Sequence, residues 1–411
     1  MSVFPNIAIR HLFSIGSGAT PESGNPDYWD GDIFWVTPED VSAAKDGKIV
    51  GTKRRITDDG LRSCSARLSP PETIVLTKRA PIGQLAVAEV ELCSNQGCFL
   101  LEPGSGVDPQ FYFHWLNANT AYLQILGRGS TFMELSTDDL KSLRVPHPPI
   151  HVQNSIAGFL NENAAQIDTL IEAKQKLLGL LAEKRRTLVA EAVMRGLDRS
   201  APLRPSDIDW LGDIPAHWKI ERSRWLFNER DERSETGEEE MLTVSHITGV
   251  TPRSQKDVNM FEAETTAGYK LCFTGDLVIN TLWAWMGAMG TAPVDGIVSP
   301  AYNVYTPGQR LLPAYVDALV RIPVFAQEVT RYSKGVWSSR LRLYPEGFFE
   351  TFWPVPPLDE QEQIVARIAE ERVKIDKLAT ATERSITLLK ERRSALIAAA
   401  VTGQIAIPEA A

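Results

Sequence analysis

Small clusters of arginine and lysine, some with serine beside them, carry the side chains best suited to chemistry in this sequence. Their forked or charged donors suit hydrogen bonds to base edges and contacts with phosphate, so they are candidates for binding nucleic acid. The first half of the chain contributes Lys53, Arg54, Arg55, Lys78, Arg79, Arg128 and Ser130, and the second half contributes Arg253, Lys256, Lys334, Ser338, Arg340 and Arg342. Taken singly, each is more simply interpreted as a solvated surface residue. The segments 127–135 and 333–343 are favoured, because they occupy matching places in a repeat described below.

Three tryptophans in the second half of the chain could add aromatic contacts. The rings of Trp283, Trp285 and Trp337 have the size to stack or wedge against bases. Packing in a hydrophobic core is the favoured interpretation, because aromatic side chains of this size usually dominate cores.

Two patterns with a possible catalytic meaning are interpreted as loops. Residues 25–29, NPDYW, depart from the Asn-Pro-Pro-Tyr motif with which adenine-N6 methyltransferases hold a flipped base, because Asp27 replaces the second proline. The 24 residues before this stretch contain no glycine-rich strand-to-helix turn for a methyl donor. Asp27, Asp46 and Lys48 loosely resemble the carboxylates and lysine of metal-dependent nucleases, but AKDGK is typical of a turn, whereas that chemistry needs its second carboxylate on a strand.

Other motifs of known chemistry are missing from the sequence. There is no GxxxxGK[ST] phosphate loop, no HExxH pair and no GxSxG elbow, and the six histidines are scattered. Cys64, Cys93, Cys98 and Cys272 are irregularly spaced, which predicts buried thiols rather than a zinc site. We therefore expect no catalytic, cofactor or metal site, although folding can assemble residues that no motif predicts.

Length and composition indicate a multidomain globular protein. A chain of 411 residues exceeds one ordinary core and predicts two or three domains. No apolar run approaches the ~20 residues that span a bilayer, and the start, MSVFPNIAIRHLF, lacks the features of a secretory signal, so we expect a cytoplasmic protein. The net charge of -9 argues against indiscriminate binding of polyanions, but only the charge of the contacting face decides the matter.

An internal repeat organises the sequence. A shift of 208 positions aligns residues 148–193 with 356–401 without a gap, and seventeen of these 46 positions are identical. This is far above the roughly one in fifteen expected of unrelated chains of ordinary composition. The same shift places Gly127, Ser130 and Leu135 on Gly335, Ser338 and Leu343. Duplication is the simplest explanation.

Both copies of the repeat are predicted to be long helices. Apolar residues recur seven apart, at Leu160, Ile167, Leu181 and Leu188 and at Ile368, Ile375, Leu389 and Leu396, with a polar break at Lys174 and Thr382. Helices of this length need a partner, and each copy is the natural partner of the other in a coiled coil whose polar position could help fix the register. Two separate helices, each packed on its own domain, are the alternative. In the second copy the proline pair is followed by Asp359, which we expect as the N-cap, with Glu362 as its capping-box partner.

Segments before the helices indicate that the domains are duplicated too. Residues 72–87 and 275–290 are both β-rich runs that turn at Gly83 or Gly287. Within the domains we expect helices at 121–126 and 313–322 and a strand at 72–77. The expected organisation is a first domain (1–145), a central helix (146–197), a linker (198–209), a second domain (210–353), a C-terminal helix (354–405) and a tail (406–411).

The repeat motifs together resemble one known family. The helix start VPPLDEQEQI, the continuation IDKL, the helix end LLKERRSALIAAAVTGQI and the domain opening WLGDIPAHW are similar to those of the specificity subunit of type I restriction-modification systems. The resemblance covers almost the whole chain in order. It departs from the family at the first helix start, where His151 and Asn154 replace the acidic cap.

This resemblance implies a fold and a role that composition does not supply. The fold would be mixed α/β, with two pseudo-symmetric α/β target recognition domains joined by two long antiparallel coiled-coil spacer helices. Each domain would enter the major groove at one half of a split, asymmetric DNA site. Two methyltransferase subunits would dock on the helices, and two restriction subunits would join for cleavage. S-adenosylmethionine would belong to the methyltransferase partner, and ATP and Mg to the motor-nuclease partner, leaving this chain without a cofactor.

Three other interpretations remain open at this stage. The chain could be the recognition subunit of another type of restriction system with similar domains. It could be an enzyme with a divergent nuclease or methyltransferase centre, which alanine at Asp27, Asp46 and Lys48 would reveal. It could also be a scaffold that binds only protein, which salt-sensitive, sequence-specific retention of DNA would exclude.

Overall fold

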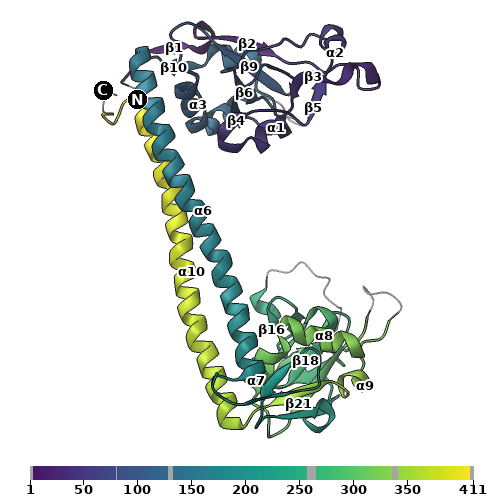
Figure 1. Ribbon diagram of the computed structural model, residues 1–411. Coiled ribbons are helices and arrows are strands. Elements are labelled where there is room, and N and C mark those ends of the chain that lie inside the picture. Colours follow the sequence, from purple (N-terminus) through teal and green to yellow (C-terminus); the bar gives the residue numbers. More distant parts are fainter. Residues whose placement is uncertain (1–2, 80, 128–132, 257–264, 336–340, 408–411) are drawn as a thin grey trace. The chain divides into compact units, whose positions relative to one another are not determined.

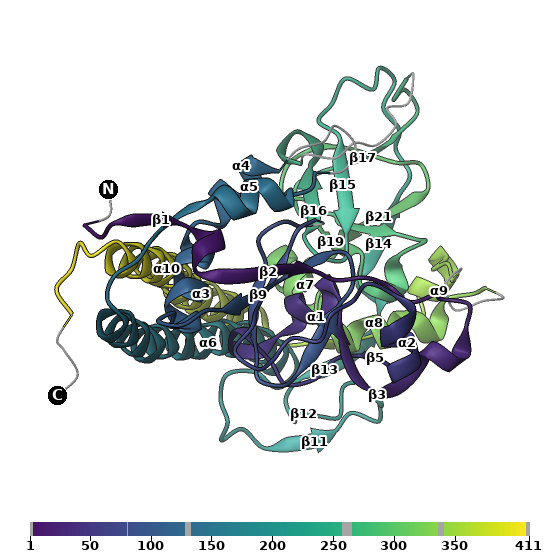
Figure 2. The same ribbon diagram turned by 90° about the horizontal axis from the view of Figure 1, so that it is seen from above.

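The computed structural model describes residues 3–79, 81–127, 133–256, 265–335 and 341–407 (Figures 1 and 2). The chain divides into two compact units. Unit 1 comprises Met1–Gln175 and Glu383–Ala411, and unit 2 comprises Lys176–Thr382. Helices α6 (Ile150–Arg195) and α10 (Leu358–Val401) each run from one unit into the other. Each unit therefore holds one end of both helices.

Unit 1 is built on a five-stranded sheet in the order β2-β9-β6-β7-β4. Its strands are β2 (Phe13–Ser17), β9 (Cys98–Pro103), β6 (Ile74–Thr77), β7 (Leu85–Ala88) and β4 (Lys48–Ile49). The other strands are β5 (Arg54–Ile56), β3 (Trp29–Val36) and β8 (Leu92–Ser94), which form a three-stranded sheet, and the pair β1 (Asn6–Ala8) and β10 (Arg144–Pro146). The short helices are α1 (Pro38–Ala43), α2 (Asp58–Ser63), α3 (Pro109–Ala118), α4 (Thr120–Leu126) and α5 (Thr137–Ser142).

Unit 2 is built on a four-stranded sheet in the order β14-β21-β18-β19. Its strands are β14 (Phe227–Arg230), β21 (Tyr302–Pro307), β18 (Leu277–Asn280) and β19 (Met289–Thr291). The paired strands beside it are β11 (Leu203–Pro205) with β12 (Asp213–Pro215), β13 (Lys219–Arg222) with β22 (Phe352–Val355), β15 (Leu242–Ser245) with β16 (Gly249–Pro252), and β17 (Lys270–Cys272) with β20 (Gly296–Val298). The helices are α7 (Pro313–Val320), α8 (Pro323–Tyr332) and α9 (Pro345–Phe348).

The two units repeat the same sheet order, which supports duplication of the whole domain. Strands β2, β9, β6 and β7 have their counterparts in β14, β21, β18 and β19. In both units the central strand is buried on both faces: Ile74 and Leu76 belong to one hydrophobic cluster and Val75 to another, and Leu277 and Ile279 are separated from Val278 in the same way. The predicted turns at Gly83 and Gly287 are confirmed, with φ of 92° and 86° that favour glycine.

Both long helices begin at the second proline of their proline pair. The carbonyl of Pro149 accepts the amides of Val152 and Gln153, and the carbonyl of Pro357 accepts those of Glu360 and Gln361. The expected N-cap at Asp359 is therefore wrong, because Pro357 holds the cap position and Asp359 lies in the first turn. There its charge and that of Glu360 still favour the helix N-terminus.

Within each unit the two helices run antiparallel and share one ion pair. In unit 1 Arg393 of α10 lies 2.9 Å from Asp168 of α6, and in unit 2 Arg185 of α6 lies 3.2 Å from Asp376 of α10. Asp168 and Asp376 are equivalent in the repeat, as are Arg185 and Arg393. Each unit therefore contains the same Asp–Arg contact, with α6 and α10 in exchanged roles. Thr382 is buried, but its hydroxyl donates to the carbonyl of Leu378 in its own helix. The hydroxyl of Thr382 is therefore engaged within its own helix, and the ion pairs link the two helices.

A buried glutamine ties each helix to the domain that precedes it. Gln153 accepts the amide of Asp108 and donates to the carbonyls of Gly106 and Pro148. Gln361, its counterpart in the repeat, accepts the amide of Leu312 and donates to the carbonyls of Arg310 and Pro356. Both side chains are fully buried, so each amide group satisfies backbone groups that water cannot reach.

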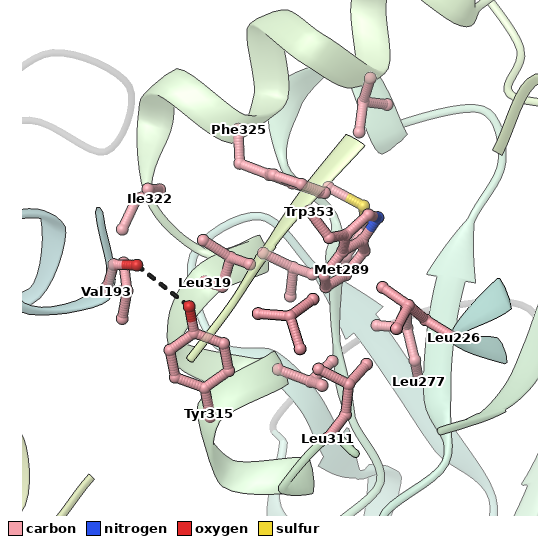
Figure 3. Packing of buried hydrophobic residues seen from close by; sticks show 14 of the residues in the cluster. Val193, Leu226, Leu277, Met289, Leu311, Tyr315, Leu319, Ile322, Phe325 and Trp353 are labelled. Carbon is pink, nitrogen blue, oxygen red and sulfur yellow. Dashed lines mark hydrogen bonds between the residues drawn. The ribbon is translucent and has the colours of Figure 1, made fainter. Parts of the chain in front are cut away.

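Each domain core is completed by two helix ends, one from each copy. In unit 1, Ile156 and Leu160 of α6 pack in the same cluster as Ala400 and Val401 of α10, next to α3 (Figures 1 and 2). In unit 2, Ile364 of α10 and Val193 of α6 take the corresponding places. Figure 3 shows the hydroxyl of Tyr315 directed at the carbonyl of Val193, 3.1 Å away, and burial raises the pKa of this phenol.

The segment between α6 and the second domain folds onto unit 2. Strands β11 and β12 form a hairpin, and Trp210, Leu211 and Ile214 enter the core of the unit. Trp218 donates its indole N–H to Glu360 in the first turn of α10, at 2.9 Å. The expected linker (198–209) thus contributes β11 to unit 2, and the residues that follow it pack in the core of that unit.

The buried glutamine tether predicts a large loss from a small change. Replacing Gln361 by Ala removes one acceptor and two donors from buried backbone partners, and should lower the free energy of unfolding of unit 2 by about 1–3 kcal/mol. Urea denaturation of the full chain would measure the effect. Gln363→Ala is the matched control, because Gln363 is exposed on the same helix turn and should change stability by less than about 0.5 kcal/mol. Equal effects of the two substitutions would contradict the tether.

Candidate nucleic-acid interface

The connections β6–β7 and β18–β19 share a backbone framework in the two units. In unit 1 the amide of Thr77 donates to the carbonyl of Gln84, and in unit 2 the amide of Asn280 donates to the carbonyl of Ala288. Each connection also receives a bond from a later segment of its domain, which follows α4 in unit 1 and α8 in unit 2: the amide of Leu135 donates to the carbonyl of Lys78, and the amide of Leu343 donates to the carbonyl of Thr281. Leu135 and Leu343 are repeat equivalents and both are buried. The same scaffold thus presents two different loop tips.

In unit 1 the loop tip is basic but is partly neutralised by its own domain. The side chain of Lys78 is only 13% exposed, donates to the hydroxyl of Ser17 and lies 3.3 Å from the carboxylate of Glu134. Arg79 lies 3.9 Å from the same carboxylate and is more exposed. Lys78 therefore has a structural role, and Arg79 is the more accessible of the two cations. Glu134 is not among the residues predicted from the sequence, where its only signal is its place beside Leu135 in the repeat.

The cluster Lys53, Arg54 and Arg55 does not form one surface. Successive side chains of a strand point to opposite faces. Arg54 lies 3.6 Å above the ring of Trp29, whereas Arg55 lies 4.5 Å above Phe34. Lys53 pairs with Glu39 at 2.5 Å, and this bond raises the pKa of Lys53. The two arginines are held flat by aromatic rings, but they cannot both face the same bound surface.

In unit 2 two cations lie side by side at the base of the loop. Lys334 and Arg342 face each other across an antiparallel bridge, each donating its amide to the other's carbonyl at 2.9 Å. Residues directly opposite in such a bridge place their side chains on the same face, where like charges repel. Among the described residues neither side chain has a carboxylate within salt-bridge distance. This arrangement favours an anion as a ligand.

The tip above these cations is aromatic. Trp283 is half exposed and stacks on Trp285, with 6.4 Å between ring centroids and 22° between ring planes. The expectation that these tryptophans pack in the core is therefore wrong for Trp283. The reason is Ala284, which is fully buried and fills the inward position of this turn with a methyl group, leaving its larger neighbours outside.

The remaining candidates are Arg253, Lys256 and five residues that the structure does not describe. Arg253 follows strand β16 and donates to the sulfur of Met241 at 3.6 Å, and burial lowers the pKa of Lys256. Arg128, Ser130, Trp337, Ser338 and Arg340 lie outside the described residues. Of the favoured segments 127–135 and 333–343, the structure describes residues 127, 133–135, 333–335 and 341–343.

The two patterns with a possible catalytic meaning are occupied by local structure. The side chain of Asn25 accepts the amide of Asp27, so its oxygen caps its own turn. Asp46 has a φ of 51° in the predicted turn, and Lys48 pairs with Glu89 at 2.6 Å. The described part of the chain contains no group of three or more His, Cys, Asp or Glu that could hold a metal ion.

The cysteines behave largely as expected. All four are free; Cys93, Cys98 and Cys272 are buried as predicted, and Cys64 is partly exposed. Burial raises the pKa of the three buried thiols to about 12. Among the helices of the described residues, none has the length and apolar character to cross a bilayer.

Comparison with known proteins identifies related chains. A family described as the type I restriction modification DNA specificity domain matches residues 4–178. The MjaIX specificity subunit of a type I restriction enzyme from Methanocaldococcus jannaschii is 36% identical over 170 residues, which cover 41% of this chain and 38% of that relative's length. The EcoBI specificity subunit from Escherichia coli is 20% identical over 408 residues, covering 92% of this chain and 77% of that relative.

Solved structures agree on the fold. A chain from a study of complex assembly and conformational transition of the type I R-M system matches with a TM-score of 0.68 and 18% identity, covering 98% of both chains. A crystal structure of the HsdS subunit from Thermoanaerobacter tengcongensis matches with a TM-score of 0.59 and 18% identity, over 98% of this chain and 97% of that one. The sheet order and the paired helices agree with the fold of these two structures, and residues 4–178 belong to the family described as the type I restriction modification DNA specificity domain.

Proposed function

We propose that this chain is the sequence-specific DNA-binding subunit of a type I restriction-modification complex. It reads a bipartite, asymmetric DNA site, and partner subunits methylate adenine and cleave. The observation that carries the proposal is the duplicated scaffold with unlike loop tips: β6–β7 presents Arg79, whereas β18–β19 presents Trp283 and Trp285. Two copies of one framework with different contact chemistry suit two different half-sites.

The cations at the loop bases fit this role. Phosphate contacts need positive charge, and the bridge between Lys334 and Arg342 concentrates two charges on one face. The net charge of -9 limits sequence-independent binding elsewhere on the chain. We also propose a cytoplasmic location, because the DNA that such a subunit would bind lies there.

The chain itself is proposed to be non-catalytic. The residues of the two patterns with a possible catalytic meaning are engaged in a helical cap, a turn and an ion pair. Methylation and cleavage would be the work of partners, with S-adenosylmethionine in the methyltransferase and ATP and Mg in the motor-nuclease. The complex would contain two methyltransferase and two restriction subunits.

Exposed leucines on the long helices suit two equivalent docking sites. Unit 1 exposes Leu170 and Leu388, and unit 2 exposes their repeat equivalents Leu378 and Leu180, with 45–55% of each side chain accessible. By the seven-residue repeat these leucines lie on one flank of the helix pair, opposite the ion pairs of Asp168 and Asp376. Exposed apolar residues grouped in this way mark protein contacts.

The exposed Lys334 and the largely buried Lys78 predict different effects of substitution, the first on DNA affinity and the second on stability. Lys334→Ala should weaken retention of all DNA sequences and reduce the salt slope of binding by about one, since a phosphate contact is lost, with stability unchanged or raised. Lys78→Ala should lower the free energy of unfolding by about 1–2 kcal/mol, because Glu134 and Ser17 lose a buried partner. Gel shift at several salt concentrations and urea denaturation measure the two effects. Unchanged DNA affinity of the Lys334 variant would remove that residue from the interface.

The helix pair predicts a change in the spacing of the half-sites. Insertion of seven residues after Gly179 in α6 and after Thr380 in α10 preserves the heptad register and adds about 10 Å. The gap between half-sites should then grow by about three base pairs, at about 34 Å per ten base pairs. Genome-wide mapping of methylated adenine would measure it, with cells lacking the gene as the control that must lose the motif. A motif that survives deletion of the gene would refute the proposed function, and an unchanged gap would refute the helices as spacers.

The leucine pairs predict the stoichiometry of the complex. Leu170→Glu with Leu388→Glu should remove one methyltransferase copy from the assembly, and the four-fold variant that adds Leu378→Glu and Leu180→Glu should remove both. Native mass spectrometry counts the copies. Val373→Glu is the matched control, because Val373 is exposed on the other flank of α10 and should leave both copies bound. Full occupancy in the four-fold variant would exclude this flank as the docking surface.

A further inference from the structure

The tip of the β18–β19 connection exposes an unusual run of apolar side chains. Leu282, Trp283 and Met286 are all exposed, and Trp285 is partly exposed. A connection at the surface of a folded domain ordinarily carries polar residues, and in unit 1 Arg79 stands at the position of Leu282. A contiguous apolar surface of this kind indicates a contact with a ligand.

Contacts within the tip hold its side chains in one arrangement without a ligand. The indole N–H of Trp285 donates to the carbonyl of Leu282 at 3.0 Å, and the two indole rings stack. Ala284 is buried beneath them, and Gly287 closes the turn in the left-handed region with a φ of 86°. A preorganised aromatic surface loses little conformational entropy on binding, so contacts made by its rings are retained in the affinity.

The surroundings of the tip favour DNA as the ligand. The amide of Leu343 donates to the carbonyl of Thr281 at 3.1 Å, which places the Lys334–Arg342 bridge at the base of the tip. An apolar head above two cations is complementary to a double helix, in which base edges lie between two rows of phosphate. A protein partner would need carboxylates opposite the same two cations.

The dimensions of the tip select one groove. The ring centroids are 6.4 Å apart, and with the thickness of the rings the stack measures about 10 Å. The minor groove of B-DNA is about 6 Å wide, whereas the major groove is about 12 Å wide. The major groove also displays the one apolar group of the base pairs, the C5 methyl of thymine. With its N–H already engaged, Trp285 is suited to apolar contact rather than to hydrogen bonding.

We propose that residues 282–286 form an apolar reading head that contacts thymine methyl groups in the major groove of the half-site bound by unit 2. This inference rests on the proposed function and names the chemistry by which one of its two domains selects sequence. Unit 1 reads its own half-site with different side chains, because its connection contains no tryptophan and carries Arg79 where unit 2 has Leu282. Trp283, the more exposed ring, is the principal contact.

Replacing thymine by uracil tests the contact directly, since uracil lacks only the methyl group. The full chain with its methyltransferase partner would be titrated with duplexes that carry the motif mapped in cells, with uracil at one position at a time. Wild-type affinity should fall about fourfold for each contacted methyl, and only within one half-site. In Trp283→Ala, overall affinity should fall about tenfold, and uracil at those positions should have no further effect.

Controls separate the possible failures. Trp225→Ala removes a more exposed tryptophan of the same unit and should keep the wild-type response to uracil, and Trp283→Phe should retain part of it. Uracil without effect at any position, or an undiminished effect in Trp283→Ala, would overturn the reading head. Loss of partner binding with DNA affinity intact would also overturn it and assign the tip to a protein contact. If the wild-type complex itself retains no specific duplex, the proposed function fails instead.

Discussion

The buried closure of each domain core by two helix ends is the constraint on which the architecture depends. A helix with one apolar stripe has to bury that stripe against a partner, and here the partner is the second copy of the same helix. Because the copies run antiparallel within each unit, the start of α6 meets the end of α10 in unit 1, and the start of α10 meets the end of α6 in unit 2. Ala400 and Val401, which lie late in the sequence, therefore complete the core of unit 1, whose sheet is formed by early residues of the sequence. Gln153 and Gln361 then fix each helix to its domain, and each side chain bonds one backbone amide and two backbone carbonyls.

This closure leaves the reading loops free to differ. The bonds that hold the β6–β7 and β18–β19 connections use backbone atoms, such as the amides of Thr77 and Asn280, so they place few demands on side chains. A tip can change from basic to aromatic without disturbing the sheet below it. The strands outside the shared sheet differ as well: β5, β3 and β8 form a three-stranded sheet in unit 1, whereas β15 pairs with β16 and β17 with β20 in unit 2. The two units therefore differ most in the loop tips and outer strands, where a difference in preferred DNA sequence would arise under the proposed function.

Sequence reasoning was sufficient for features that depend on local pattern. The repeat, the long helices, and the turns at Gly83 and Gly287 follow from identity at fixed spacing, apolar periodicity and backbone requirements. It failed where a contact joins distant residues. Nothing near Lys78 in the sequence indicates that Glu134 neutralises it, and nothing near Arg54 indicates that Trp29 lies beneath its guanidinium. The N-cap expected at Asp359 failed for a different reason. The sequence offered two neighbouring candidates for the N-cap. Pro357 is the cap, because the extended backbone ends at this residue and its carbonyl accepts the first helical amides.

The distribution of charge connects these observations to the proposed function. Lys53 and Lys78 are bound to carboxylates of their own domain, so unit 1 offers fewer accessible cations than its sequence suggests. Unit 2 keeps Lys334 and Arg342 together without such a carboxylate among the described residues. Under the proposed function, a net charge of -9 would limit non-specific attraction to DNA, so base edges and shape would have to supply much of the affinity. That balance would favour discrimination between DNA sequences over tight binding.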